Sequence, residues 1–238
     1  INVVHFAIAG GNIEIVRLLH TYDFDFTGAP HFAALYHRNE IFEWTVSVLE
    51  IPVKQYLPFD HASVLEYAAK SFNISAIDYC FDENIFDDDP PNRQFTFLHF
   101  ATENCIVEVV DYVLHKFEFD LLQEIGTESI LYYPIKIDRL DYVTFFVSKE
   151  PRLVNLRSHF QAPIWTAAQY GRVDIVNFLS QHPSISITPQ NKSELSDPYE
   201  EAETPFPKTT NVFEFAKYQM KRRLEIIRSK NPFFIGIK

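Results

Sequence analysis

The stretch HFAIAGGNIEIVRLL, residues 5–19, decides the fold. Its apolar residues follow a helical spacing, are interrupted by Gly10 and Gly11, and resume the same spacing two residues later. Apolar residues three and four positions apart are typical of a helix that buries one face. The stretch therefore predicts two short helices joined by a glycine turn.

The same arrangement recurs along the chain. Equivalent positions are residues 5, 31, 66, 99, 132 and 165, at intervals of 26, 35, 33, 33 and 33 residues. Self-similarity at a fixed period indicates a repeat architecture. Helices this short are not stable alone in water, so we expect six helix-turn-helix units whose apolar faces join into one continuous core.

Each unit has two halves with different compositions. The first half keeps small residues where neighbouring units approach, and Gly11 or Gly171 ends it by taking a positive φ. Elsewhere residues that tolerate this conformation lie at or next to the same place, namely Asn39, Asn73, Asn104 and Asp138. The second half, as in residues 107–114, predicts a longer helix with one buried stripe.

The repeated motif resembles the ankyrin repeat over residues 1 to about 182. The matching pieces are Thr96-Phe-Leu98-His99, Pro163-Ile-Trp165-Thr-Ala167-Ala168 and the acidic series Glu14, Glu40, Glu108, Asp141 and Asp174. The resemblance implies an all-α fold, an α-solenoid of helix-turn-helix repeats with short or irregular finger loops. The 26-residue interval lacks about seven residues of the 33-residue unit, so we expect a tight turn over residues 23–30.

Three units depart from the family at one position. Glu66, Tyr132 and Trp165 stand where the family has histidine. The hydrogen bond between that histidine and the entry hydroxyl is therefore expected only for Thr96 with His99.

The sequence divides into three parts. Residues 1–182 are expected to form the solenoid of six units. Residues 183–210 hold five prolines and five acidic residues, which predicts an acidic, proline-rich loop. Over residues 211–230 apolar residues recur at helical spacing below a basic outer face, which predicts a C-terminal helix that caps the solenoid.

Charge and composition limit the class of protein. The net charge is −11; residues 1–207 carry −17 and the remainder carries +6. So acidic a body disfavours nucleic acid as a partner. No apolar run is long enough to span a membrane, no signal peptide is recognisable, and the two cysteines are too few for a disulfide framework. We expect a monomer in the cytoplasm or nucleus and, because the chain begins with Ile1, part of a longer polypeptide.

Motifs of catalysis, of cofactor binding and of metal binding are absent from the sequence. It has no glycine-rich phosphate loop, HExxH, GxSxG or paired CxxC. The acidic run over residues 82–89 lacks calcium-loop spacing and is expected to be solvated. Lys221-Arg222-Arg223 could touch an anionic membrane or nucleic acid, but a solvated cap is preferred. His5, His31 and His99 share one repeat position, which favours a structural role, and Cys80 and Cys105 are expected to be buried.

The resemblance implies a binding surface formed by finger loops and by residues after the alanine pair of each first helix. The helix positions are Lys70, Ser71, Glu103, Asn104, Lys136, Ile137, Gln169 and Tyr170. The finger positions are Asn92, Arg93, Phe95, Glu124, Glu128, Ser158, His159 and Gln161. Arg93, Phe95 and Tyr170 are of the residue types most often found at hot spots.

These features predict a non-catalytic protein–protein interaction module with no cofactor, no metal and no small-molecule substrate. The alternative is a regulatory or targeting domain of a larger enzyme, channel or ubiquitin-ligase adaptor. An enzyme in its own right is the third and least favoured hypothesis.

Overall fold

The computed structural model describes residues 2–58, 60–86, 91–124, 126–159, 161–186 and 212–230. Over these ranges the chain forms thirteen α-helices, one 3-10 helix and no β-strand. The all-α class predicted from the sequence is therefore confirmed. The chain divides into two compact units, residues 1–119 and 120–238, and each is described by itself.

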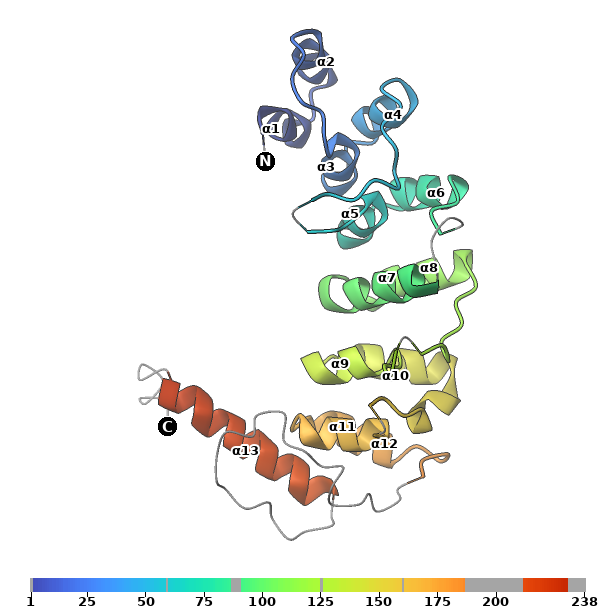
Figure 1. Cartoon of the computed structure of the whole chain (residues 1–238), viewed down its shortest axis with the longest axis vertical. Coiled ribbons are helices and arrows are strands. Elements are labelled where there is room, and N and C mark those ends of the chain that lie inside the picture. The colour runs from blue at the N-terminus through green and yellow to red at the C-terminus, as the bar shows by residue number, and fades with distance from the viewer. Residues whose placement is uncertain are drawn as a thin grey trace. The chain divides into compact units, whose positions relative to one another are not determined.

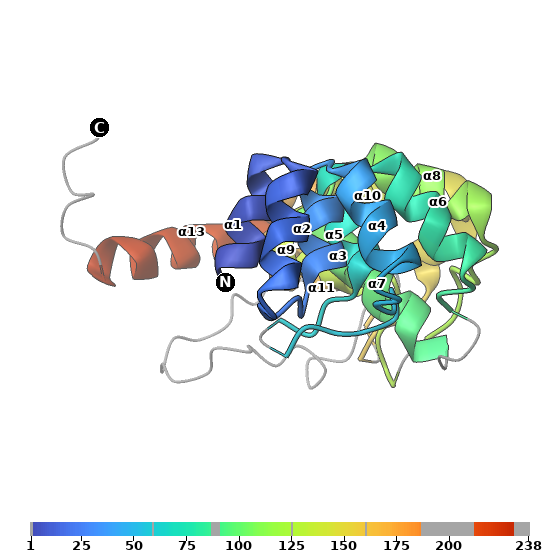
Figure 2. The same cartoon turned by 90° about the horizontal axis from the view of Figure 1, so that it is seen from above.

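The first unit consists of four consecutive helix pairs (Figure 1). The pairs are α1 (Val3–Gly10) with α2 (Ile13–Thr21), α3 (Ala29–Leu35) with α4 (Asn39–Ser47), α5 (Val64–Ser71) with α6 (Ile74–Asp82), and α7 (Pro91–Asn104) with α8 (Val107–Lys116). The first helices pack in sequence order, α1 on α3, α3 on α5 and α5 on α7, while α2 packs on α4 and α4 on α6. Seen from above, neighbouring pairs of this unit partly overlap (Figure 2). Pairs that are neighbours in sequence are therefore neighbours in space within the unit.

The second unit contains two helix pairs and one longer helix (Figure 1). The pairs are α9 (Tyr132–Ile137) with α10 (Leu140–Lys149) and α11 (Pro163–Gln169) with α12 (Val173–Ser180), and the 3-10 helix η1 (Pro151–Asn155) follows α10. Helix α9 packs on α11, α10 packs on α12, and α13 (Val212–Lys230) packs on both α11 and α12. The C-terminal helix predicted over residues 211–230 is thus present against the last pair. Most of the predicted acidic loop, residues 187–210, lies outside the described residues.

Side-chain caps explain where several helices begin. Asn2 accepts a hydrogen bond from the His5 amide in α1, and Asn73 accepts one from the Ala76 amide in α6. Ser63 forms a reciprocal capping box with Glu66 at the start of α5. Such caps supply acceptors for amides that have no partner within the helix.

The turn inside five of the six pairs contains a residue with positive φ. Gly11 and Gly171 fill this position at φ +81° and +66°, and Asp138 fills it at +70°, as the sequence predicts. In the third pair Phe72 takes the left-handed conformation at φ +54°, and the adjacent Asn73 caps the next helix instead. The second pair uses His37 at φ +55°, whereas the fourth pair, in which the predicted Asn104 ends α7, has no residue with positive φ in its turn.

A first set of hydrogen bonds joins the turns of successive pairs. In each case the N-cap residue of a second helix donates to a backbone carbonyl in the last turn of the preceding pair's first helix. These donors and acceptors are Arg38 to Ala9 at 2.6 Å, Asn73 to Ala34 at 2.9 Å, and Arg172 to Lys136 at 2.5 Å. Carbonyls at helix ends lack partners in their own helix, so a neighbouring pair satisfies them.

A second set of contacts joins the start of one pair to the loop before the next. Nε2 of His5 donates to the Thr27 carbonyl at 2.8 Å, and Nε2 of His31 donates to the Gln55 carbonyl at 2.9 Å. Both rings stand third in their helices, α1 and α3. The structural role predicted for these two histidines is confirmed.

Helix α13 lies so close to the turn of the last pair that only glycine fits there. A Cβ added at Gly171 would lie 2.7 Å from the backbone nitrogen of Met220. One face of the first half of α13 is buried, formed by Val212, Phe215, Ala216 and Gln219. This half provides the packing surface.

Burial of His31 predicts a pH dependence of stability. Removal of the ring from water lowers the pKa of His31 from 6.5 to about 4, and the hydrogen bond to Gln55 offsets this only in part. The unfolded chain then binds a proton that the folded chain excludes, so stability is complete above about pH 6.5 and declines as the pH falls toward 4. We expect His31 to account for a loss of about 3 kcal/mol across this interval. Urea unfolding at a series of pH values measures this loss in the wild type and in His31→Gln, which keeps a donor for the Gln55 carbonyl but does not titrate. If the free energy of unfolding of the two proteins changes in parallel with pH, His31 is not the cause.

Substitution of Gly171 tests the packing of α13. We expect Gly171→Ala to lower the free energy of unfolding by about 2–4 kcal/mol, because the positive φ is strained and the methyl group meets backbone. Hydrogen exchange should accelerate across α13. The control is Gly10→Ala, where a Cβ would meet no atom within 4 Å and where we expect no loss. Equal effects of the two changes would show that the close approach to Met220 is not a constraint.

Candidate partner-binding surface

Two loops of the second unit lie side by side, one formed by residues 126–129 and one that contains residues 158, 159 and 161. Ser158 and Gln161 close the second loop by exchanging backbone hydrogen bonds of 2.8 and 2.9 Å, and the Ser158 hydroxyl accepts from the Ser129 amide at 2.9 Å. Ser158 and Gln161 are buried, so they shape the loop and present little surface to a partner. Their expected placement as exposed finger contacts is therefore wrong.

His159 forms the exposed tip of this pair of loops. Its backbone amide donates to the Thr127 carbonyl at 2.8 Å. Its ring lies between two side chains of the first loop, with Nδ1 2.7 Å from the Thr127 hydroxyl and Nε2 3.1 Å from a Glu128 carboxylate oxygen. A neutral imidazole can accept from the hydroxyl and donate to the carboxylate at once.

The same three groups occur in hydroxyl–imidazole–carboxylate triads of acyl-transfer enzymes. Here, however, the hydroxyl and the carboxylate come from adjacent residues of one loop, and the imidazole and carboxylate side chains are 47% and 36% exposed. The arrangement joins two loops through one ring. We interpret His159 as a residue that positions these loops.

A row of aromatic side chains continues from His159 across the first helices. The ring of Tyr132, on α9, lies 4.7 Å from the His159 ring, and its hydroxyl lies 3.2 Å from the hydroxyl of Tyr170, which ends α11. Arg223 of α13 stands over the Tyr170 ring at 5.1 Å. We call His159, Tyr132 and Tyr170 the aromatic row. Burial, together with the Tyr170 hydroxyl, raises the pKa of Tyr132, so this phenol stays neutral.

The predicted helix positions of the second unit border this row. Lys136 is exposed on α9, with its ammonium 5.8 Å from the centre of the Tyr132 ring, and Gln169 is partly exposed on α11. The sequence places Tyr170 among the exposed binding positions, yet only 9% of it is exposed. This expectation is corrected, because neighbouring side chains, Tyr132 and Arg223 among them, lie against it.

In the first unit the predicted helix positions are exposed but do not form such a row. Lys70 and Glu103 are exposed on α5 and α7, which pack on one another. Asn104 is partly exposed and donates to the Phe100 carbonyl of its own helix at 3.0 Å. These residues offer polar groups of both signs.

The structure overturns the placement of Asn92, Arg93 and Phe95 in a finger loop. All three lie in α7, which therefore begins well before the expected entry at Thr96. Arg93 and Phe95 are buried, and the Phe95 ring lies 4.3 Å from the ring of His99. The side chain of Asn92 lies outside the described residues.

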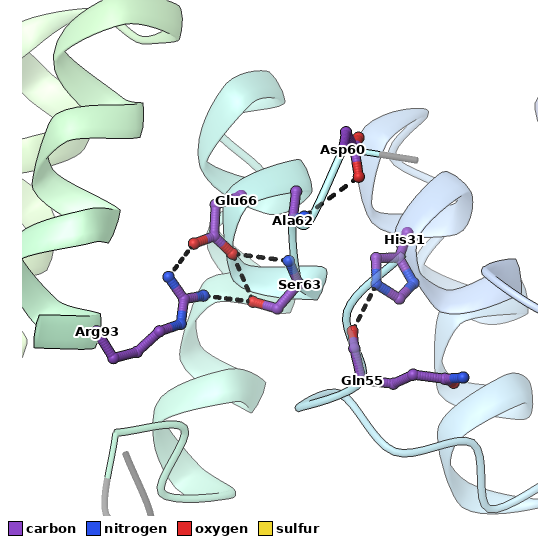
Figure 3. Close-up of polar contacts among 7 residues, drawn as sticks. All are labelled: His31, Gln55, Asp60, Ala62, Ser63, Glu66 and Arg93. Carbon is purple, nitrogen blue, oxygen red and sulfur yellow. Dashed lines mark hydrogen bonds and ion pairs between the residues drawn. The ribbon is translucent and has the colours of Figure 1, made fainter. Parts of the chain in front are cut away.

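Arg93 takes part in a buried ion pair with Glu66 that joins α7 to α5 (Figure 3). Its Nη2 also donates to the Ser63 hydroxyl at 2.8 Å, and its guanidinium stands 5.0 Å from the centre of the Tyr56 ring. Glu66 in turn accepts from the Ser63 amide at 2.9 Å and from its hydroxyl at 2.5 Å. Glu66, which stands at the repeat position that His5 and His31 occupy in the first two pairs, thus links its pair to the next one as they do.

One spacing in the sequence corresponds to these links. Arg93 follows Glu66 by 27 positions, and His159 follows Tyr132 by the same number. Where Glu66 or Tyr132 occupies the histidine position, a partner side chain therefore follows 27 positions later, at the start of the next helix pair or in the loop before it. Thr127 and Arg223 gave no comparable signal.

Other chemistry is limited in the described part of the chain. No group of three or more His, Cys, Asp or Glu side chains is placed to hold a metal ion there, and no helix in those ranges has the length and apolar character to cross a membrane. Asp87–Asp89 of the acidic run lie outside the described residues. Cys80 and Cys105 are buried, as expected, and burial raises the pKa of the Cys80 thiol.

Comparison with known proteins adds no identification: no protein-family model matches the chain, and no curated protein matches it. The resemblance to ankyrin repeats therefore stays a prediction from the sequence. Any proposal of function depends on the residues and on their geometry.

Removal of Arg93 tests the buried ion pair. We expect Arg93→Met to lower the free energy of unfolding by about 3–5 kcal/mol, because Glu66 is left charged and buried without its partner. The double variant Arg93→Met, Glu66→Gln removes that charge and keeps an acceptor for the Ser63 amide, so it should lose less. Urea unfolding measures both. Equal losses would mean that the unpaired charge is not the cause.

Proposed function

We propose that this protein is a non-catalytic interaction module, built as a divergent ankyrin-like solenoid of six helix pairs. It binds a protein partner through the finger loops and the last turns of its first helices. The repeat intervals of the sequence and the ordered packing of consecutive pairs within each unit support the proposed architecture.

The aromatic row of His159, Tyr132 and Tyr170 is the observation that carries the proposed function. It brings a finger loop and two first helices into one contact chain, the two regions that ankyrin-like stacks use for binding. Exposed Lys136 and half-exposed Glu128 lie at its edges. Aromatic side chains beside charged groups of both signs are typical of surfaces that recognise other proteins.

The row is also held in place before any partner arrives. The Tyr132 hydroxyl is hydrogen-bonded to Tyr170, and the His159 ring is held from both sides by Thr127 and Glu128. Side chains that are already ordered lose less conformational entropy on binding. This order supports the recognition of a partner by the row.

Charge reversal beside the row tests the proposal. Ligands are selected from a random peptide display library against the whole chain, and their affinities are then measured for the wild type and for Lys136→Glu. We expect Lys136→Glu to weaken binding at least tenfold, or about 1.4 kcal/mol.

The matched control is Lys149→Glu on α10. Lys149 is also exposed and also stands over an aromatic ring, 5.4 Å from the centre of Phe145, but it lies at the end of a second helix. We expect its affinity to stay within about twofold of the wild type. Equal binding by all three proteins, each with unchanged circular dichroism, means that the partner binds another surface.

A further inference from the structure

Four large apolar side chains are exposed together on the first helix pair. Val3 and Phe6 of α1 are 48% and 70% exposed, and Ile15 and Leu18 of α2 are 50% and 54% exposed. Both helices carry their buried residues on another side, against the following pair. We call the four exposed residues the N-side face.

The second pair provides an internal comparison for this face. Its helices repeat those of the first pair 26 positions later, helix for helix. The equivalents of Val3, Phe6 and Ile15 are Ala29, Phe32 and Ile41, whose exposures are 0%, 6% and 1%. The same three positions are thus buried in the second pair, on which the first pair packs.

The contacts that cover the second pair show which groups a helix pair must supply to cover the N-side face in the same way. The ring of His5 stacks on Phe32 at 4.1 Å, from the first helix of the covering pair. Trp44, the equivalent of Leu18, meets the rings of His20 and Phe26 at 5.6 and 5.9 Å. The covering surface is therefore a ring on a first helix and apolar or aromatic groups on a second helix and its loop.

We propose that the N-side face binds a helix pair of the same build as α1 and α2, stacked in the register in which α1 and α2 cover α3 and α4. This inference is independent of the proposed function, since it concerns other residues and the other unit. A ring of the occupant's first helix lies over Phe6, and its second helix packs on Leu18.

The charges of the first unit favour this occupant over a second copy of the chain. Beside the N-side face, Glu14 and Arg17 pair with one another at 3.0 Å, so the face has no net charge of its own. Residues 1–119, however, hold 18 acidic and six basic residues. Two such units brought together at this face would repel each other.

Tyr22 serves as the matched control, because exposure alone does not mark the face. It is 70% exposed, as Phe6 is, but its equivalent in the second pair, Val48, remains 64% exposed although a pair covers that side. Stacking is therefore not expected to involve Tyr22.

The test places a known occupant on the face. Residues 2–27 are duplicated directly before Asn2 in the whole chain, which sets the copy in the 26-residue register. We expect the Tm of the first unit to rise by about 5–10 °C, since four apolar side chains become buried. Amide exchange measured by mass spectrometry should slow across the original α1 and α2.

Substitutions in the receiving pair decide the outcome. Phe6→Lys with Leu18→Lys in the original copy should abolish the rise in Tm, whereas Tyr22→Lys should preserve it. A duplication that leaves Tm unchanged, or a rise that survives the two lysines, overturns the proposal. Sedimentation of the unmodified chain supplies the remaining check, because a dimer that Phe6→Lys abolishes and Tyr22→Lys retains would assign the face to a second copy instead.

Discussion

Short helices place many backbone carbonyls in a last turn, where no amide of the same helix can reach them. In this protein the missing donors come from the neighbouring pair, through the N-cap side chains of Arg38, Asn73 and Arg172. A buried carbonyl without a donor costs about 1–3 kcal/mol. The first, second and fifth pairs thus depend on the pair that follows for polar groups as well as for apolar cover.

The same dependence positions the candidate binding surface. In the first unit, two loops are each held by a histidine of the preceding pair, since His5 holds the carbonyl of Thr27 and His31 holds the carbonyl of Gln55. In the second unit Tyr132 contacts His159, whose ring is fixed by Thr127 and Glu128. Residues that hold the loops are therefore the residues that order the aromatic row. The exposed neighbours, such as Lys136, are free to differ because no helix packing depends on their identity.

Local patterns were enough to predict the helix pairs, since apolar spacing, caps and turn residues act within a few positions of one another. They were not enough to place Arg93 and Phe95. The match to Thr96-Phe-Leu98-His99 suggested that a helix starts there, but α7 already includes Arg93, whose partner Glu66 belongs to the pair before. The predicted exposure of Tyr170 is wrong for a related reason, because Arg223, which lies over its ring, comes from a helix far along the chain. Each miss involves a contact between segments that the local pattern treats separately.

The third residue of the first helix links its pair to the next one in each of the first three pairs, although the chemistry of the link differs. Histidine donates to a loop carbonyl in the first two pairs, while Glu66 in the third uses an ion pair with Arg93. The carboxylate cannot donate to a carbonyl, so the link forms only because an arginine occupies the next pair at the matching place. A comparison that scores residue identity registers two mismatches here, although the link between pairs is preserved. The helix pair is therefore defined by a backbone and a loop that need a partner from the preceding pair, and more than one type of side chain can be that partner.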